Sequence, residues 1–256
     1  MNNKIKILIV ILLLAIIAVF FILRNKLNDD TPKEIDANSD DVTSLVYPTI
    51  TTWHGQFPWF YDEFTVEDLK RSTLMHIAAT RFFEDHESLR SGEHNNTSVW
   101  WISANELESN FRRIFGPDIP FQNSNINSSD IHCFELDVFV STENAYPFNS
   151  RCGRASIKPF VIKELVKATE QGDYRHTYFN VLRWADDATI VNLDEDNGIF
   201  GPLGIYIVDK NGDITSKQSE AEVRLAFNNG THDLYRFTFK KQSDGKFYIH
   251  SGNWVE

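Results

Sequence analysis

The stretch DKNGDITSKQSE, residues 209–220, has the residue types of a calcium-binding loop. Its oxygen-bearing side chains belong to Asp209, Asn211, Asp213, Thr215 and Glu220. An EF-hand loop needs glycine at its sixth position for a sharp turn, and that position is the β-branched Ile214 here. Asn211-Gly212, in contrast, is a strong signal for a two-residue hairpin. The stretch therefore predicts a turn between strands, and we expect no metal site in it.

No other spacing of residues indicates a metal site, a cofactor or a nucleophile. His76, His86 and His94 are separated by ten and eight residues, which does not stack them on one helical face. The sequence contains no HExxH, GxSxG, P-loop or GxGxxG motif. A pair of hydrolytic carboxylates would be set by space rather than by sequence. We therefore predict no metal and no cofactor, and the sequence assigns no catalytic residue.

The chain has two cysteines, Cys133 and Cys152. A disulfide between them would close a loop of about 20 residues and contribute about 3 kcal/mol in the chain-entropy model. Two free buried thiols are the alternative. Cysteine pairs are usually oxidised outside the cytoplasm. Because the N-terminus, described below, predicts an extracytoplasmic domain, we expect the disulfide.

The N-terminus carries an unbroken apolar run, Ile7–Leu23, without glycine, proline or charge. At about 1.5 Å per residue it spans most of a hydrocarbon core of about 30 Å. A cleaved signal peptide would end in a small-residue cleavage site, whereas Arg24-Asn25-Lys26 follows this run directly. We therefore predict a single-pass anchor over residues 1–24, with the lipid bilayer as its partner and the C-terminal domain outside the cytoplasm.

The charge of the chain argues against nucleic acid as a partner. The whole chain carries −11, and residues 1–26 contribute four positive charges and no negative ones, so the remainder carries −15. Such a domain is repelled by phosphate backbones. Residues 25–44 are polar and acidic, and we predict a disordered tether there. The domain is then residues 45–256, beginning with an aromatic-rich arm over 45–64 that we expect to pack on it.

Two helices are expected next along the chain. Thr65 and Asp68 resemble a capping box ahead of a helix over 66–86. Ser103 and Glu106 form a clearer capping box. The helix that this second box starts places its apolar side chains on one face and ends at Gly116-Pro117. Those side chains belong to Leu107, Phe111, Ile114 and Phe115.

The second half of the chain has the period of strands. Alternation predicts strands over 134–140, 188–193 and 203–209. Two long strands are expected around a turn at 171–173, although 162–169 also suits a helix. The hairpin of 234–241 and 246–254, turning at 243–245, has the strongest pattern. Helices followed by antiparallel strands give an α+β fold, with helices on one face of a curved sheet. This layout is similar to the NTF2-like and cystatin-like superfolds.

Two segments resemble a known group of proteins. NELESNFRRIFGPDIPF at 105–121 and YRFTFKKQSDGKFYIHSGNW at 235–254 look like segments of uncharacterised membrane-anchored proteins of low-GC Gram-positive bacteria. The resemblance implies an N-terminal anchor followed by an extracytoplasmic domain. That group has no assigned activity, so the resemblance implies no site residues.

The sequence supports three functional hypotheses. The first is a non-enzymatic domain that binds a protein or a small ligand at the cell surface, because an anchor is predicted and catalytic motifs are absent from the sequence. The second is a cell-envelope hydrolase with an unrecognised acid/base site, which a cleft with convergent carboxylates would favour. The third is a structural subunit of an envelope complex.

Overall fold

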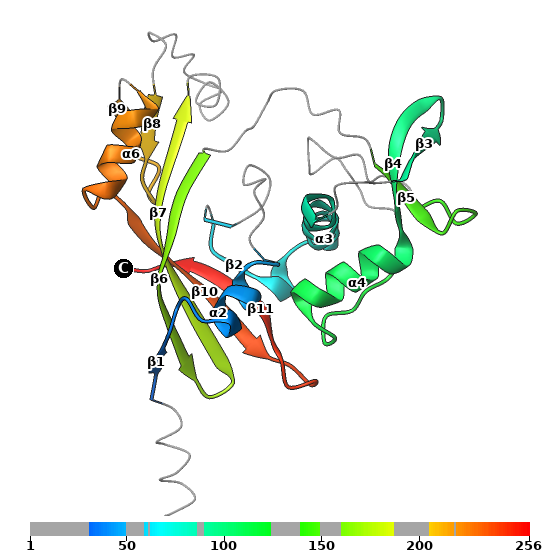
Figure 1. Ribbon diagram of the computed structural model, residues 1–256, viewed down its shortest axis with the longest axis horizontal. Coiled ribbons are helices and arrows are strands. Elements are labelled where there is room, and N and C mark those ends of the chain that lie inside the picture. The colour runs from blue at the N-terminus through cyan, green and yellow to red at the C-terminus, as the bar shows by residue number, and fades with distance from the viewer. Residues whose placement is uncertain are drawn as a thin grey trace, which may run out of the picture.

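The structure is a computed structural model that describes residues 31–49, 59–60, 62–85, 90–123, 139–148, 160–186, 205–217 and 219–256. Over these residues the chain forms two antiparallel sheets and four α-helices (Figure 1). The predicted α+β fold class is therefore confirmed. The helices are α2 (Asp40–Val46), α3 (Arg71–Asp85), α4 (Ala104–Phe115) and α6 (Glu220–Asn228), with a short 3-10 helix η2 (Val66–Asp68).

Several predictions concern residues outside these ranges. They are the anchor at Ile7–Leu23, the cysteines Cys133 and Cys152, His86, the strand at 188–193 and most of the strand at 134–140. In the part of the chain that is described, no helix is long and apolar enough to cross a membrane. The anchor and the disulfide therefore stay predictions.

The larger sheet has eight antiparallel strands, and six of them follow the order β1-β6-β7-β10-β11-β2. The strands are β1 (Lys33–Ile35), β2 (Phe64–Thr65), β6 (Phe160–Gln171), β7 (Tyr174–Asp186), β8 (Ile205–Val208), β9 (Ile214–Lys217), β10 (Asp233–Lys241) and β11 (Phe247–Trp254). Both predicted hairpins are confirmed, and 162–169 is strand. Gly172 and Gly245 close the two turns with φ of 56° and 79°, which glycine adopts at little cost.

Strand β7 has two partners along the edge opposite β6. Strand β10 pairs with it over residues 174–181, and β8 pairs with it over residues 183–186. Strand β9 continues the sheet beyond β8. The sheet therefore divides at the end of β7 into a broad part with β10 and β11 and a narrow part with β8 and β9 (Figure 1).

The helices cover the two faces of this sheet unequally. Helices α3 and α4 lie on one face, here called the inner face, and α6 lies on the opposite, outer face at one end (Figure 1). Alternation along β7 explains this arrangement. Val181 belongs to the core of the inner face, while its neighbour Leu182 packs with Ile207 and Val223 beneath α6.

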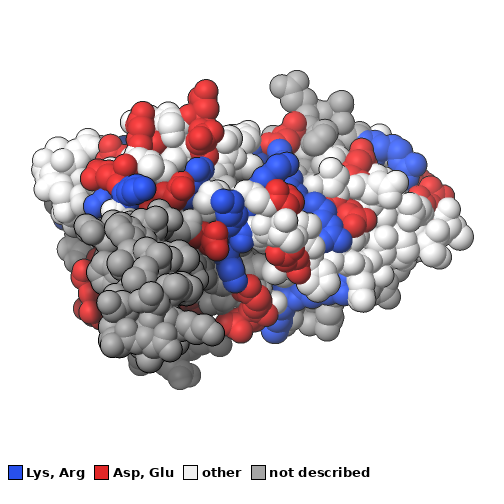
Figure 2. Space-filling model, turned by 90° about the horizontal axis from the view of Figure 1, so that it is seen from below, with Lys and Arg blue, Asp and Glu red and all other residues white. Residues whose placement is uncertain are grey.

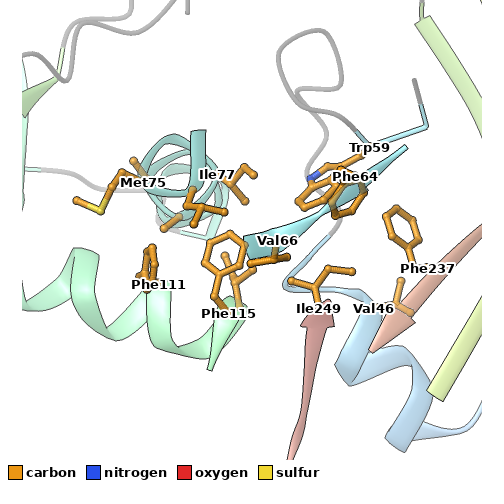
Figure 3. Packing of buried hydrophobic residues seen from close by; sticks show 14 of the residues in the cluster. Val46, Trp59, Phe64, Val66, Met75, Ile77, Phe111, Phe115, Phe237 and Ile249 are labelled. Atoms are coloured by element: carbon orange, nitrogen blue, oxygen red, sulfur yellow. The ribbon is translucent and has the colours of Figure 1, made fainter. Parts of the chain in front are cut away.

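Buried side chains fill the space between the helices and the inner face (Figure 3). The labelled side chains from α3, α4, β10 and β11 are Met75, Ile77, Phe111, Phe115, Phe237 and Ile249. The Phe237 ring has its centroid within 5.1–6.3 Å of five other rings. These rings belong to Trp59, Phe60, Phe64, Phe179 and Tyr235. Trp59 and Phe60 are fully buried, which confirms that this part of the predicted arm packs on the domain.

Helix α4 follows its sequence signals. The Glu106 amide donates to Ser103 Oγ at 3.2 Å, and the Ser103 amide donates to Glu106 Oε2 at 3.0 Å, which is the predicted capping box. The predicted apolar face is buried. The helix ends at Gly116, which has φ of 79° and ψ of −179°.

The capping box predicted at Thr65 is wrong. Thr65 makes no side-chain capping bond, and only the 3-10 turn of η2 follows it before α3 begins at Arg71. Thr65 instead pairs with Ser251 as the last residue of β2. Thr65 and Asp68 have the spacing of a helix start, but Thr65 is part of a strand because it pairs with Ser251 of β11.

The disordered tether predicted over 25–44 is wrong from Lys33 onward. Strand β1 pairs with β6, placing Lys33 opposite Glu170. Helix α2 buries Val42 and Val46, which are 1% and 9% exposed. Val42 and Val46 are one helical turn apart, and Val46 lies just beyond the predicted tether, so the polar composition of 25–44 concealed the start of a helical face that packs on the core.

A second sheet was not predicted. It has the order β3-β4-β5, with β3 (Arg90–His94), β4 (Thr97–Ser103) and β5 (Ala145–Phe148). The indole of Trp101 lies against β3, where a Cβ on Gly92 would come within 2.7 Å of Trp101 Nε1. Glycine at this position lets the indole cover the neighbouring strand.

Candidate functional site

The calcium-like stretch is a turn, as predicted. The Asp209 carboxylate accepts hydrogen bonds from the amides of Asn211 and Asp213 at 2.8 and 2.9 Å. Gly212 supplies a φ of 89° between the paired strands β8 and β9. Glu220 lies in the first turn of α6, where it pairs with Arg224 at 2.5 Å. The carboxylates of Asp209 and Glu220 are therefore engaged in building the turn and the helix.

His76 and His94, which the sequence predicts not to share a helical face, lie in different elements. His76 is fully buried in α3, and burial lowers its pKa to about 4. His94 ends β3, with its ring 5.7 Å from Trp101. Across the described ranges, no three His, Cys, Asp or Glu side chains gather as metal ligands.

A groove with a volume of about 460 Å³ lies between η2 and the end of β11. Its lining residues are Glu63, Phe64, Thr65, Asp68, Leu69, Ser251, Gly252 and Asn253. Two carboxylates, two hydroxyls and an amide thus surround a small apolar surface. This combination can bind a ligand that has both hydroxyl groups and an apolar side.

The short strand β2 creates this groove. It pairs with β11 only at Thr65 and Phe64, after which the chain turns away into η2. The Tyr235 hydroxyl donates to the Asp62 carbonyl at 2.8 Å and fixes the approach to β2. Gly252 leaves room for this packing, because a Cβ there would come within 2.5 Å of the Tyr235 hydroxyl.

A cluster of ring side chains lies on the outer face beside the groove. We call Tyr174, His176, Tyr178 and His250 the ring cluster. Tyr174 and His176 are nearly parallel, with an interplanar angle of 9° and centroids 6.5 Å apart. Tyr174 is also 6.1 Å from His250. Tyr178 continues the same face of β7 and lies beneath Lys167 Nζ at 5.9 Å.

The imidazole of His176 is held in place by hydrogen bonding. Its Nδ1 lies 3.0 Å from Thr238 Oγ1. Burial, and then the positive charge of Arg236, lower the pKa of His176. The lowered pKa favours the neutral ring, whose Nδ1 can hydrogen-bond with the threonine hydroxyl.

Contacts join the ring cluster to the groove. Glu67 of η2 reaches His250, with Oε2 3.4 Å from Nδ1. Arg236 donates twice to Asn253 Oδ1, at 3.2 and 3.0 Å, and thereby orients an amide that lines the groove. The groove and the ring cluster are thus two parts of one surface.

Charges of both signs are interspersed over the molecular face in Figure 2. The net negative charge of the chain is therefore not concentrated in one acidic patch on this face. A mixed surface favours recognition by individual hydrogen bonds over long-range attraction.

Sequence reasoning missed both the groove and the ring cluster. The ring cluster combines β7 with β11, and the groove combines η2 with β11, so neither has a motif along the chain. The alternation of Tyr174, His176 and Tyr178 was the available signal. Comparison with protein-family models, curated proteins and solved structures finds no match to this chain.

Proposed function

We propose that this chain is a membrane-anchored extracytoplasmic domain that binds a small polar ligand at the cell surface, in the groove between η2 and β11. The observation that carries this proposal is the groove itself. Its volume of about 460 Å³ is within the usual range of small-molecule sites. Phe64 and Leu69 give it an apolar surface, and Glu63, Asp68 and Asn253 give it hydrogen-bonding groups.

The architecture supports a binding role. Large side chains fill the space beneath α3 and α4. The groove lies instead at the sheet edge formed by β2, where it is open to solvent. The packing of α3 and α4 on one face of the sheet is similar to the layout of NTF2-like and cystatin-like domains, a likeness of fold alone, although α6 lies on the opposite face. The apolar run Ile7–Leu23 supports the anchored location, and an extracytoplasmic domain would in turn favour a disulfide between Cys133 and Cys152.

Labelling of intact cells tests the location. We expect the native chain to resist a membrane-impermeant maleimide until it is reduced, because Cys133 and Cys152 are bridged outside the cytoplasm. The Cys133→Ser variant should then label on intact cells without reduction, through Cys152. Labelling of either chain only after permeabilisation would overturn the extracytoplasmic location.

Ligand binding in the groove is tested with the full chain in lipid nanodiscs and a mixture of small polar compounds, followed by saturation-transfer NMR. We expect the Glu63→Gln/Asp68→Asn double variant to weaken binding by about tenfold or more, since charged hydrogen bonds are lost. The control is Glu93→Gln/Asp213→Asn, which removes two exposed carboxylates on β3 and in the β8–β9 turn. Binding unaffected by the groove variant, or no binding at all, would contradict the proposed function.

A further inference from the structure

We infer that the ligand is a neutral, extended carbohydrate chain, which binds from the groove across the outer face onto the ring cluster. This inference rests on the proposed function, because the groove would hold one end of the chain. Sugar rings present apolar C–H faces together with a rim of hydroxyl groups. A surface that binds them needs flat rings for the faces and hydrogen-bonding side chains for the rim.

The ring cluster supplies the flat surfaces. Tyr174 is 37% exposed, and its ring is nearly parallel to that of His176. His250 extends the cluster toward the groove, where Glu67 holds it. Rings that are fixed by neighbours lose little conformational entropy when a ligand stacks on them.

Hydroxyl side chains form a row that leads from the groove to these rings. Strand register places Thr65, Ser251, Thr238 and His176 opposite one another on β2, β11, β10 and β7. Three interstrand steps cover about 14 Å. Several linked sugar rings would be needed to cover this length, so the surface suits an oligomer better than a single sugar.

Side chains of both charges surround the ring cluster. On the strands of this face and on η2, the cations are Lys167, Arg236 and Lys240, and the carboxylates are Glu34, Glu67, Asp68 and Glu164. Arg236 is bound to Asn253, and Glu67 is bound to His250. A polymer of either charge would therefore meet like charges along this surface, whereas neutral hydroxyl groups can use both donors and acceptors.

Oligosaccharide titration of the full chain in nanodiscs tests this inference. The probes are glucose, N-acetylglucosamine and their linear β-linked oligomers, with α-linked glucose oligomers as coiled comparison ligands. We expect an extended β-linked oligomer to bind about tenfold more tightly than its monomer, because it also stacks on the ring cluster. Tyr174→Ala should remove this gain and leave the affinity for the monomer unchanged.

Two further variants separate stacking from other effects. Tyr174→Phe keeps the ring and should keep the gain with chain length. Trp100→Ala removes a 38% exposed ring from β4 of the second sheet and should also leave the gain intact. Thermal unfolding of each variant shows whether the fold is preserved.

The remaining outcomes overturn one proposal or the other. Equal affinity for monomer and oligomer, sensitive to the groove variant, would retain the groove and overturn binding on the ring cluster. Groove-dependent binding of other compounds, with no carbohydrate bound, would overturn the ligand class alone. No groove-dependent binding of any compound would overturn the proposed function, and this inference with it.

Discussion

Replacing Gly116 with alanine is expected to lower the free energy of unfolding by about 4 kcal/mol, from backbone strain and overpacking together. Gly116 has φ of 79° and ψ of −179°, a conformation that is essentially confined to glycine. An added Cβ would also collide with the carboxamide of Gln242 and approach Tyr248 Cδ2 to 2.6 Å. Urea unfolding of the full chain in nanodiscs, followed by tryptophan fluorescence, would measure the loss.

Gly245→Ala is the matched control for this prediction. Gly245 has the same φ of 79°, but a Cβ added there would have no neighbouring atom within 4 Å. We expect a loss of about 1–2 kcal/mol at this position, from backbone strain alone. Equal losses for the two variants would show that the contact with Gln242 does not contribute.

The sensitivity of Gly116 comes from a junction between α4 and the last hairpin. Gln242 Nε2 donates to the Phe115 carbonyl at 2.7 Å, and Gln242 Oε1 accepts from the Asp118 amide at 2.9 Å. Ser243 Oγ donates to Asp118 Oδ1 at 2.5 Å. Hydrogen bonds thus connect the segments 105–121 and 235–254, which carry the sequence resemblance.

The stability of the protein is expected to fall as the pH is lowered from about 6.5 to about 4. Burial lowers the pKa of His76 from 6.5 to about 4. Above this window the imidazole is neutral in both states, whereas within it the unfolded chain binds the proton first. The lost stability approaches about 3 kcal/mol at the lower end of the window. Unfolding free energies measured across this window would follow the loss.

His76→Gln should flatten this part of the pH profile, because the side chain no longer titrates. His232→Gln, which alters an exposed histidine, should retain the slope. His176 adds to the loss in the same direction, since its pKa is lowered too. If the unfolding free energy of His76→Gln fell with pH as steeply as that of the native chain, the loss of stability could not be assigned to His76.

Asp85 contributes at lower pH. Burial alone would raise its pKa, but hydrogen bonds from Arg113 and Arg81 outweigh burial and hold the pKa below its usual value. Because the pKa of Asp85 is lower in the folded protein than in the unfolded chain, the ionised carboxylate stabilises the fold at neutral pH. It is lost only as the pH falls through the lowered pKa of Asp85, at the acid end of the profile.

Elements with complete local signals were predicted correctly from the sequence. Helix α4 has a capping box, an apolar face and a terminating glycine within one short stretch. The β10–β11 hairpin combines alternation with a turn at Ser243–Gly245. In both cases neighbouring residues contain the whole pattern, so tertiary contacts were not needed to recognise it.

Elements that depend on distant partners were missed. Strand β1 has three residues, and its pairing with β6 gives it a place in the sheet. The wrong capping box at Thr65 has the same origin, because Ser251 lies far away in the sequence. The groove and the ring cluster depend on the register of four strands, which no local pattern specifies.

The pairing of β1 also sets how the domain would be presented on a cell. Lys33 lies opposite Glu170, one residue before the end of β6, so the chain enters the fold beside the β6–β7 turn. The end of the sheet with α6, β8 and β9 lies opposite this point of entry (Figure 1), so under the proposed anchoring the chain from the membrane would join the fold at the other end. A connection through β1 also means that tension on the anchor would reach the central sheet first, before it reached either helix above the core.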